Sequence, residues 1–132
     1  NTKLNNNMSE LIDYLIGKNI TVGVVTNKHS RYVNKIIQGL KLNDKLSCVV
    51  TGDMVSNPKP DIDGLIKASE ITQCHVSETI YVGDDKRDII AGRNAGMITV
   101  AADFGFIRED INVGLWKADL IINDPMDLAK HI

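Results

Sequence analysis

The 132-residue sequence has few of the residues that mark a specialised environment. It holds only two cysteines, Cys48 and Cys74, and they form no CxxC pair, so a disulfide framework or a zinc site has little support. No apolar run approaches the roughly 20 residues that cross a bilayer, and the first ten residues lack the pattern of a signal peptide. We therefore expect a cytoplasmic protein with reduced thiols and no membrane partner.

A basic stripe is also missing. The 15 Lys and Arg residues are scattered among 17 Asp and Glu residues, the formal net charge is −2, and aromatic residues make up 5% of the chain. Proteins that bind nucleic acid gather their positive charge on one face, so we expect no nucleic-acid partner. No repeat, low-complexity tract or linker divides the sequence, and its length fits a single domain over residues 1–132.

Amphipathic segments alternate regularly with short apolar runs. Residues 8–16 carry apolar side chains at helical spacing, and residues 20–26 (ITVGVVT) are β-branched and apolar on both faces, as in a strand covered by helices on each side. The alternation predicts an α/β, Rossmann-like fold of three layers, a parallel sheet with helices on both faces. The further strands are expected at residues 47–51, 79–83, 97–102 and 118–124, and a last helix is expected to follow Asp124 and Pro125.

Polar residues with possible functional roles lie at the end of one predicted strand and in a proline-flanked segment. Thr26 ends an apolar strand and Asn27 opens the next turn, where a hydroxyl beside unpaired N–H groups suits a phosphate oxygen. Lys59 lies between two prolines, so its ammonium is held with little freedom and can neutralise a phosphoryl group or a carboxylate. Each signal has a plainer alternative, because a strand-end Thr is often a helix cap and an isolated lysine is often a surface charge.

Three acids lie at the junction of another strand and helix. Asp84 follows the strand directly, and Asp88 lies one helical turn later on the same face, which suits a Mg²⁺ ion held by few carboxylates and completed by water. Simple capping is the alternative, since acids in a first turn are favoured by the helix dipole. The role of Asp85 stays open between the metal site and a helix cap.

The stretches VVTNK, PKPD and VGDDKRDIIAGRNAG resemble the second, third and fourth motifs of the haloacid dehalogenase-like (HAD) hydrolases, most closely the phosphoglycolate phosphatase type. The resemblance runs from the first helix to the closing ADLIIND strand. In that family a phosphoryl group is transferred to an aspartate in a DxD motif, with Mg²⁺ bridging. The resemblance implies that Thr26 and the Asn27 backbone bind phosphoryl oxygens, that Lys59 steadies the nucleophile and the transferring group, and that Asp84 ligates Mg²⁺ with support from Asp88.

The family's nucleophile motif is missing from this sequence. No DxD precedes Thr26, and the only acids before it, Glu10 and Asp13, belong to the first amphipathic helix. The family's nucleophile strand lies between the strands that end here at Thr26 and Gly83, and its substrate-selecting cap, inserted between the first two motifs, is missing too. We hypothesise a truncated gene product, a proteolytic remnant or part of a longer enzyme, with two strand edges left unpaired. Direct pairing of those two strands would contradict this hypothesis.

Several functions follow from this resemblance. The leading one is a Mg²⁺-dependent phosphatase of a small phosphorylated metabolite, inactive as this chain unless the missing segment is supplied. A non-catalytic remnant or phosphate- or metal-binding interaction module is the alternative from another class, and a phosphomutase is the alternative among enzymes. Exposed strand edges also make self-association an expectation. Substrate identity stays open, because specificity in the family resides in the cap.

Overall fold

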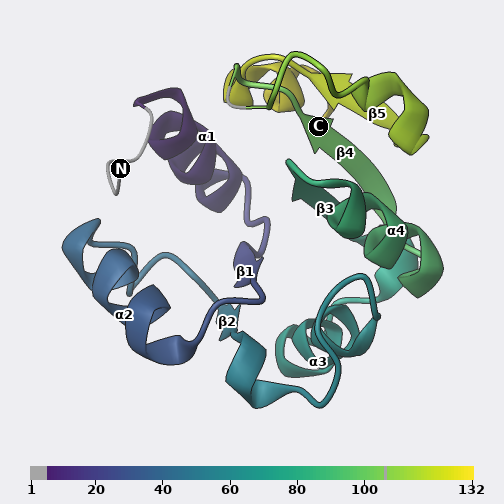
Figure 1. The fold of residues 1–132 in the computed structure, drawn as a ribbon. Helices are drawn as coiled ribbons and strands as arrows, with labels where there is room; N and C mark the ends of the chain where they lie inside the picture. Colours follow the sequence, from purple (N-terminus) through teal and green to yellow (C-terminus); the bar gives the residue numbers. More distant parts are fainter. Residues whose placement is uncertain (1–5, 106) are drawn as a thin grey trace.

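The computed structural model describes residues 6–105 and 107–132. Parallel strands alternate with helices along these residues (Figure 1). No helix among the described residues is long and apolar enough to span a membrane. The elements in chain order are α1 (Asn6–Gly17), β1 (Gly23–Val25), α2 (Ser30–Gly39), β2 (Cys48–Val50), η1 (Gly52–Met54), α3 (Asp63–Thr72), η2 (Val76–Glu78), β3 (Ile80–Gly83), α4 (Lys86–Ala95), β4 (Ile98–Ala102), η3 (Val113–Trp116), β5 (Leu120–Ile122) and η4 (Pro125–His131).

The strands form two parallel sheets. One sheet has the order β1-β2, with Val24 opposite Val49, and the other has the order β3-β4-β5, with Val82 opposite Val100. Within the described part of the chain, β1 and β3 share no ladder of hydrogen bonds. Direct pairing of β1 with β3 would have contradicted the hypothesis that a central strand is missing. The structure does not have this pairing.

One edge of β1 pairs with β2, and the opposite edge faces the β3-β4-β5 sheet. The Thr26 amide donates to the carbonyl oxygen of Val50 at 2.9 Å, so the even-numbered residues of this segment direct their backbone groups toward β2. By alternation, Gly23 and Val25 direct their N–H and C=O groups away from β2. The Val25 carbonyl oxygen accepts a hydrogen bond from the hydroxyl of Tyr81 in β3 at 3.2 Å. The free edge of β1 therefore lies on the side of β3.

Helices cover both faces of the sheets, which confirms the predicted α/β architecture. On one face α1 packs against β4, β5 and η4 through Leu11, Leu15, Val100, Ile122 and Leu128. On the other face α3 and α4 meet through Leu65, Ala91 and Ala95, together with Met97 just before β4 and next to Tyr81 of β3. Burial of these side chains, at about 25 cal/mol per Å² of apolar surface, is the main force that holds the layers together.

Two local predictions need correction. The strand expected at residues 20–26 is only Gly23–Val25, and it is half-buried to exposed because the described residues provide no strand on the edge that faces β3. By contrast, β4 has neighbours on both edges, and its Val100 and Ala101 are 1% and 0% exposed. The last helix is a 3₁₀ helix, η4, capped by Asp124.

Candidate functional site

The Lys59 ammonium lies at the centre of a polar cluster that joins the two sheets. Its Nζ is 2.5 Å from Asp88 Oδ1, 2.8 Å from the Tyr81 hydroxyl and 3.3 Å from the Val25 carbonyl oxygen. The Lys59 and Asp88 side chains are only 12% and 9% exposed. Since an ammonium group has three donors, these three acceptors account for all of them.

The start of α4 fixes Asp88. Asp85 is the N-cap and accepts from the Arg87 amide at 2.9 Å, while Asp88 Oδ2 accepts from the Asp85 amide at 3.2 Å, which completes a capping box. The hydrogen bond from the Arg87 amide lowers the pKa of Asp85. Gly83 makes room for this arrangement, because a Cβ there would lie 2.2 Å from the Cβ of Asp88. Of the two roles left open for Asp85, the structure shows the helix cap.

Tyr81 belongs to this cluster although the sequence analysis did not single it out. Its hydroxyl accepts from Lys59, donates to Val25 and lies 3.4 Å from Asp88 Oδ1. Burial, reinforced by the Asp88 charge, raises the pKa of the Tyr81 phenol well above its usual value, so the hydroxyl remains a donor. Strand alternation is the signal that could have found it, since Tyr81 shares a face of β3 with Gly83, beside Asp88.

The loop after β1 reaches Lys59 through Asn27. The Asn27 amide side chain accepts from the Lys59 backbone N–H at 2.8 Å and donates to the Lys59 carbonyl oxygen at 3.3 Å. The Thr26 hydroxyl oxygen accepts from the Lys28 amide at 3.2 Å. The structure therefore brings the VVTNK and PKPD stretches together, although Asn27 and Lys59 lie 32 positions apart in sequence.

Asp84 stands at the carboxyl end of β3 with an exposed side chain. No group of three or more His, Cys, Asp and Glu side chains that could hold a metal ion exists among residues 6–105 and 107–132. Mg²⁺ is commonly held by one or two carboxylates with water and phosphate oxygens, so an exposed Asp84 near Asp88 fits part of such a site. Both Asp88 oxygens are already hydrogen-bonded, Oδ1 to Lys59 and Oδ2 to the Asp85 amide, so Asp84 is the carboxylate of this pair that is open to an ion.

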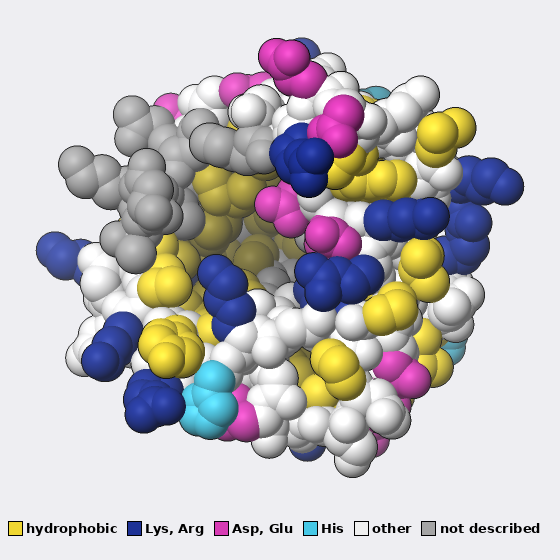
Figure 2. Space-filling view, in the orientation of Figure 1, with side chains coloured by type: hydrophobic (Ala, Val, Ile, Leu, Met, Phe, Trp, Pro, Cys, Tyr) yellow, Lys and Arg dark blue, Asp and Glu magenta, His cyan; other side chains and the backbone are white. Residues whose placement is uncertain are grey.

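The molecular surface is hollowed in the region between α1, β1 and β3 (Figure 2). Hydrophobic side chains lie deep in this hollow, and acidic and basic side chains stand along one rim. Apolar depth with a charged rim is typical of a surface that another segment or a ligand covers.

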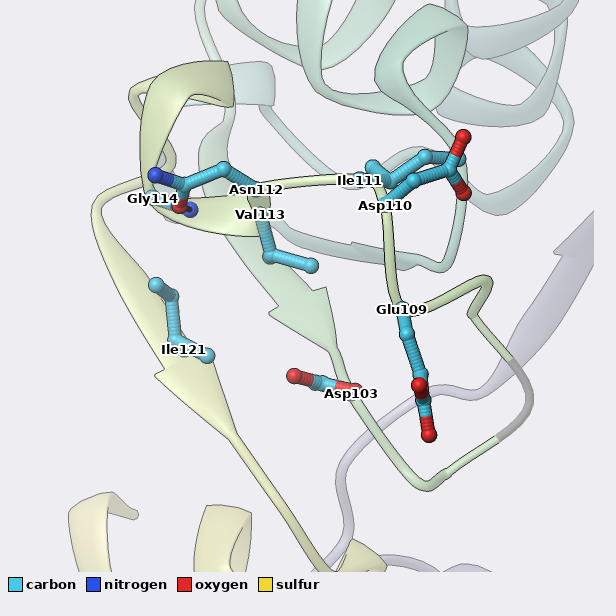
Figure 3. A pocket seen from close by; sticks show the side chains of 8 residues that line it. All are labelled: Asp103, Glu109, Asp110, Ile111, Asn112, Val113, Gly114 and Ile121. Carbon is cyan, nitrogen blue, oxygen red and sulfur yellow. Dashed lines mark hydrogen bonds between the residues drawn. The ribbon is translucent and has the colours of Figure 1, made fainter.

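A separate pocket lies between the end of β4, the side of β5 and the segment at residues 109–114 (Figure 3). The Asp103 side chain points toward Ile121, whereas the Asp110 carboxylate is directed away from both. The acids there do not converge on one point, and none of the predicted site residues lines the pocket. Its lining residues are Asp103, Glu109, Asp110, Ile111, Asn112, Val113, Gly114 and Ile121.

Parallel strands covered on both faces, with polar residues at their carboxyl ends, define a Rossmann-like α/β protein. The family model of the haloacid dehalogenase-like hydrolases matches residues 1–102. The chain belongs to this family, as its motifs predicted.

Two relatives and one solved structure illustrate the similarity. The chain is 37% identical over 131 residues to the N-acetylmuramic acid 6-phosphate phosphatase of Pseudomonas putida, covering 99% of this chain and 59% of that protein. It is 34% identical over 106 residues to a phosphoglycolate phosphatase of Xanthomonas campestris, covering 80% and 48% respectively. The crystal structure of a predicted phosphoglycolate phosphatase from Haemophilus somnus matches with a TM-score of 0.90 at 25% identity, over 98% of this chain and 57% of that one. The chain thus spans about half to three fifths of its relatives' length.

Proposed function

We propose that this chain provides part of a Mg²⁺-dependent phosphatase that acts on a small phosphorylated metabolite in the cytoplasm. The observation that carries the proposal is the Lys59 cluster, which links the Thr26–Asn27 loop to Asp88 at the start of α4. The P. putida and X. campestris relatives are named as phosphatases, which supports this reaction class. Two free thiols, Cys48 and Cys74, suit a reducing compartment.

Each residue has a defined part in the proposed reaction. The Thr26 hydroxyl and the Asn27 backbone N–H bind phosphoryl oxygens, and Lys59 neutralises negative charge on the transferring group. Asp84 holds Mg²⁺ and Asp88 supports it, and the bound ion supplies further charge neutralisation. These groups suit phosphoryl transfer because its catalysis depends mostly on positioning and on electrostatic stabilisation.

The engagement of Lys59 supports the view that this chain alone is inactive. All three of its donors are used within the protein, so contact with a phosphoryl group requires the exchange of one acceptor. The Val25 carbonyl is the most distant acceptor, at 3.3 Å, and it belongs to the free edge of β1. A strand that paired with this edge would offer Val25 a backbone N–H and release a donor of Lys59. The same strand would bring the aspartate pair that the family uses.

A non-catalytic remnant or a phosphate- or metal-binding interaction module is the second candidate, and the saturation of Lys59 favours its non-catalytic character. A phosphomutase remains the alternative within enzymes, because it shares these motifs. We also propose self-association through the free edges of β1 and β3, since unpaired strand edges accept strands from other chains. Sedimentation velocity at rising concentration tests this, and a strictly monomeric chain would contradict it.

Incubation of the purified chain with Mg²⁺ and p-nitrophenyl phosphate separates the candidates. We expect no turnover above the buffer rate from the chain alone. Turnover that Asp84→Asn abolishes would show that the chain is a complete catalyst, contrary to the inactivity proposed here, and would exclude the non-catalytic module. Turnover that survives Asp84→Asn would contradict the assigned role of this carboxylate.

A further inference from the structure

Asp53 of η1 accepts three hydrogen bonds from two segments of the chain. Its carboxylate oxygens receive the Ser30 amide, the Ser30 hydroxyl and the Thr51 hydroxyl, each at 2.8 Å. His29 Nε2 stands 3.9 Å from the same carboxylate. The hydrogen bond from the Ser30 amide, followed by those of the two hydroxyls, lowers the pKa of Asp53 far below its usual value. The carboxylate is therefore ionised throughout the neutral range.

These bonds belong to a series that fastens the loop at residues 26–30 to the end of β2. The series begins with the Thr26 amide, which donates to Val50 as described above. Further along, the Gly52 amide donates to the Lys28 carbonyl at 2.8 Å, and the Ser30 amide to Asp53 at 2.8 Å. A Cβ on Gly52 would lie 2.1 Å from the Asn27 carbonyl oxygen, so glycine permits this close approach. The loop is thus tied to the β2 side at three successive points.

The tied loop carries Asn27 and, through it, Lys59. Asn27 lies between Thr26 and Lys28, both of which are anchored, and its side chain holds both backbone groups of Lys59. Movement of the loop away from η1 would move Asn27 and the backbone of Lys59 with it. The position of the Lys59 cluster therefore depends on the hydrogen bonds that Asp53 accepts at the far end of this series.

Asp53 also occupies the positive end of a helix. Ser30 is the first residue of the ten-residue helix α2, and its amide, which would otherwise be open to an anion, is bound by Asp53. A carboxylate at this place repels other anions from the end of α2. A phosphoryl group is thereby left with the Thr26 hydroxyl and the Asn27 N–H, since the Thr26 N–H is bonded to Val50.

We propose that Asp53 is a positioning residue for phosphoryl binding, which ties the loop at residues 26–30 to η1 and so sets the place of Asn27 and Lys59. The inference rests on the proposed function for its phosphate-binding part. It assigns Asp53 no contact with the substrate.

The test uses the full chain with Asp53→Ala, Asp53→Asn and, as a matched control, Asp44→Ala at another exposed acid. Amide hydrogen exchange of Ser30 and Gly52 reports the tie, and the shift of the Asn27 amide during titration with inorganic phosphate and Mg²⁺ reports binding. With Asp53→Ala we expect about tenfold faster exchange at both amides, because charged hydrogen bonds are lost, and a similar loss of phosphate affinity. Asp53→Asn keeps one acceptor oxygen and should have a smaller effect, and the control should have none.

Unchanged exchange at Ser30 and Gly52 in both Asp53 variants would overturn the proposal. Equal acceleration in β4, far from the loop, would also overturn it, since Asp53 would then serve general stability. If Asp53→Ala fails to fold, Asp53→Asn decides. If the wild-type chain shows no phosphate response at Asn27, the proposed function fails for this chain, while the exchange data still decide whether Asp53 ties the loop.

Discussion

The β1-β2 half of the molecule and the β3-β4-β5 half hold their polar residues by different means. In the larger half, Asp88 is fixed by a capping box and is followed by Ile89, which is fully buried. In the smaller half, Thr26 and Asn27 lie on a loop that follows a half-buried strand and is tied down by Gly52 and Asp53. The acidic side of the candidate site is therefore built into the core, whereas the proposed phosphate-binding side depends on a few surface hydrogen bonds.

Lys59 joins these two halves. It comes from the loop before α3, and it bonds Val25 of the smaller half and Asp88 and Tyr81 of the larger one. Because β1 and β3 share no ladder, side chains carry the polar connection between the sheets that backbone pairing would otherwise provide. The residues of the candidate site are therefore also the residues that connect the two sheets.

The largest effect is expected at this joint. Lys59→Ala leaves Asp88 as a nearly buried carboxylate without its cation, and we expect a loss of about 3 to 5 kcal/mol in the free energy of unfolding, measured by urea denaturation. Lys130→Ala removes the exposed ion pair with Asp127 and should leave the free energy of unfolding almost unchanged. Equal losses in the two variants would show that Lys59 does not join the halves.

A matched pair of valines tests the difference in burial. Val100→Ala in β4 empties a site that is 1% exposed and should cost about 2 to 3 kcal/mol through lost transfer energy and a residual cavity. Val24→Ala in the half-buried β1 should cost about 1 kcal/mol or less, by the same area argument. The midpoints of urea unfolding measure both losses, provided that the free energy of unfolding keeps the same dependence on urea concentration. Similar midpoint shifts in the two variants would contradict the difference in burial between the two sheets.

Gly83 tests how tightly Asp88 is packed. Gly83→Ala places a methyl group against the Asp88 side chain and should destabilise the chain by about 1 to 3 kcal/mol. Gly39→Ala, in α2 of the smaller half, meets open space and should stabilise it by up to about 1 kcal/mol, since alanine favours the helix. Thermal denaturation should therefore shift in opposite directions, and a neutral Gly83→Ala would show that Asp88 can move freely.

The smallest effect is expected for the Tyr81 hydroxyl. Tyr81→Phe removes one acceptor of Lys59 and one donor to Val25, and should cost about 1 kcal/mol of unfolding free energy. Tyr32→Phe, at an exposed tyrosine of α2, should change nothing measurable. If Tyr81→Phe is as stable as the wild type, the Tyr81 hydroxyl does not contribute to the connection between the two sheets.

Much of this arrangement follows from local sequence patterns. The alternation of helices and strands, the closeness of Asn27 to Lys59 and the place of Asp88 at the start of α4 are set by strand ends and caps, which the sequence exposes directly. The family followed from the same motifs, and the model match over residues 1–102 confirms it.

Other features depend on tertiary contacts that no local pattern contains. The half-buried state of β1 results from the lack, among the described residues, of a strand on the edge that faces β3, which ITVGVVT alone cannot reveal. Tyr81 and Asp53 gain their roles only when Val25, Lys59 and Ser30 arrive from other segments. The assignments of Asp84 and Asp88 to Mg²⁺ remain predictions.

We propose that this chain holds two parts of a phosphoryl-transfer site that a further segment completes. The most direct measurement is Mg²⁺-dependent hydrolysis of p-nitrophenyl phosphate by the chain mixed with the part of the P. putida relative that it does not cover. We expect turnover in the mixture, none with either component alone, and none when the chain carries Asp84→Asn. Two components that bind each other without hydrolysing the substrate would contradict the proposal. Equal activity of the mixture with Asp84→Asn would also contradict it.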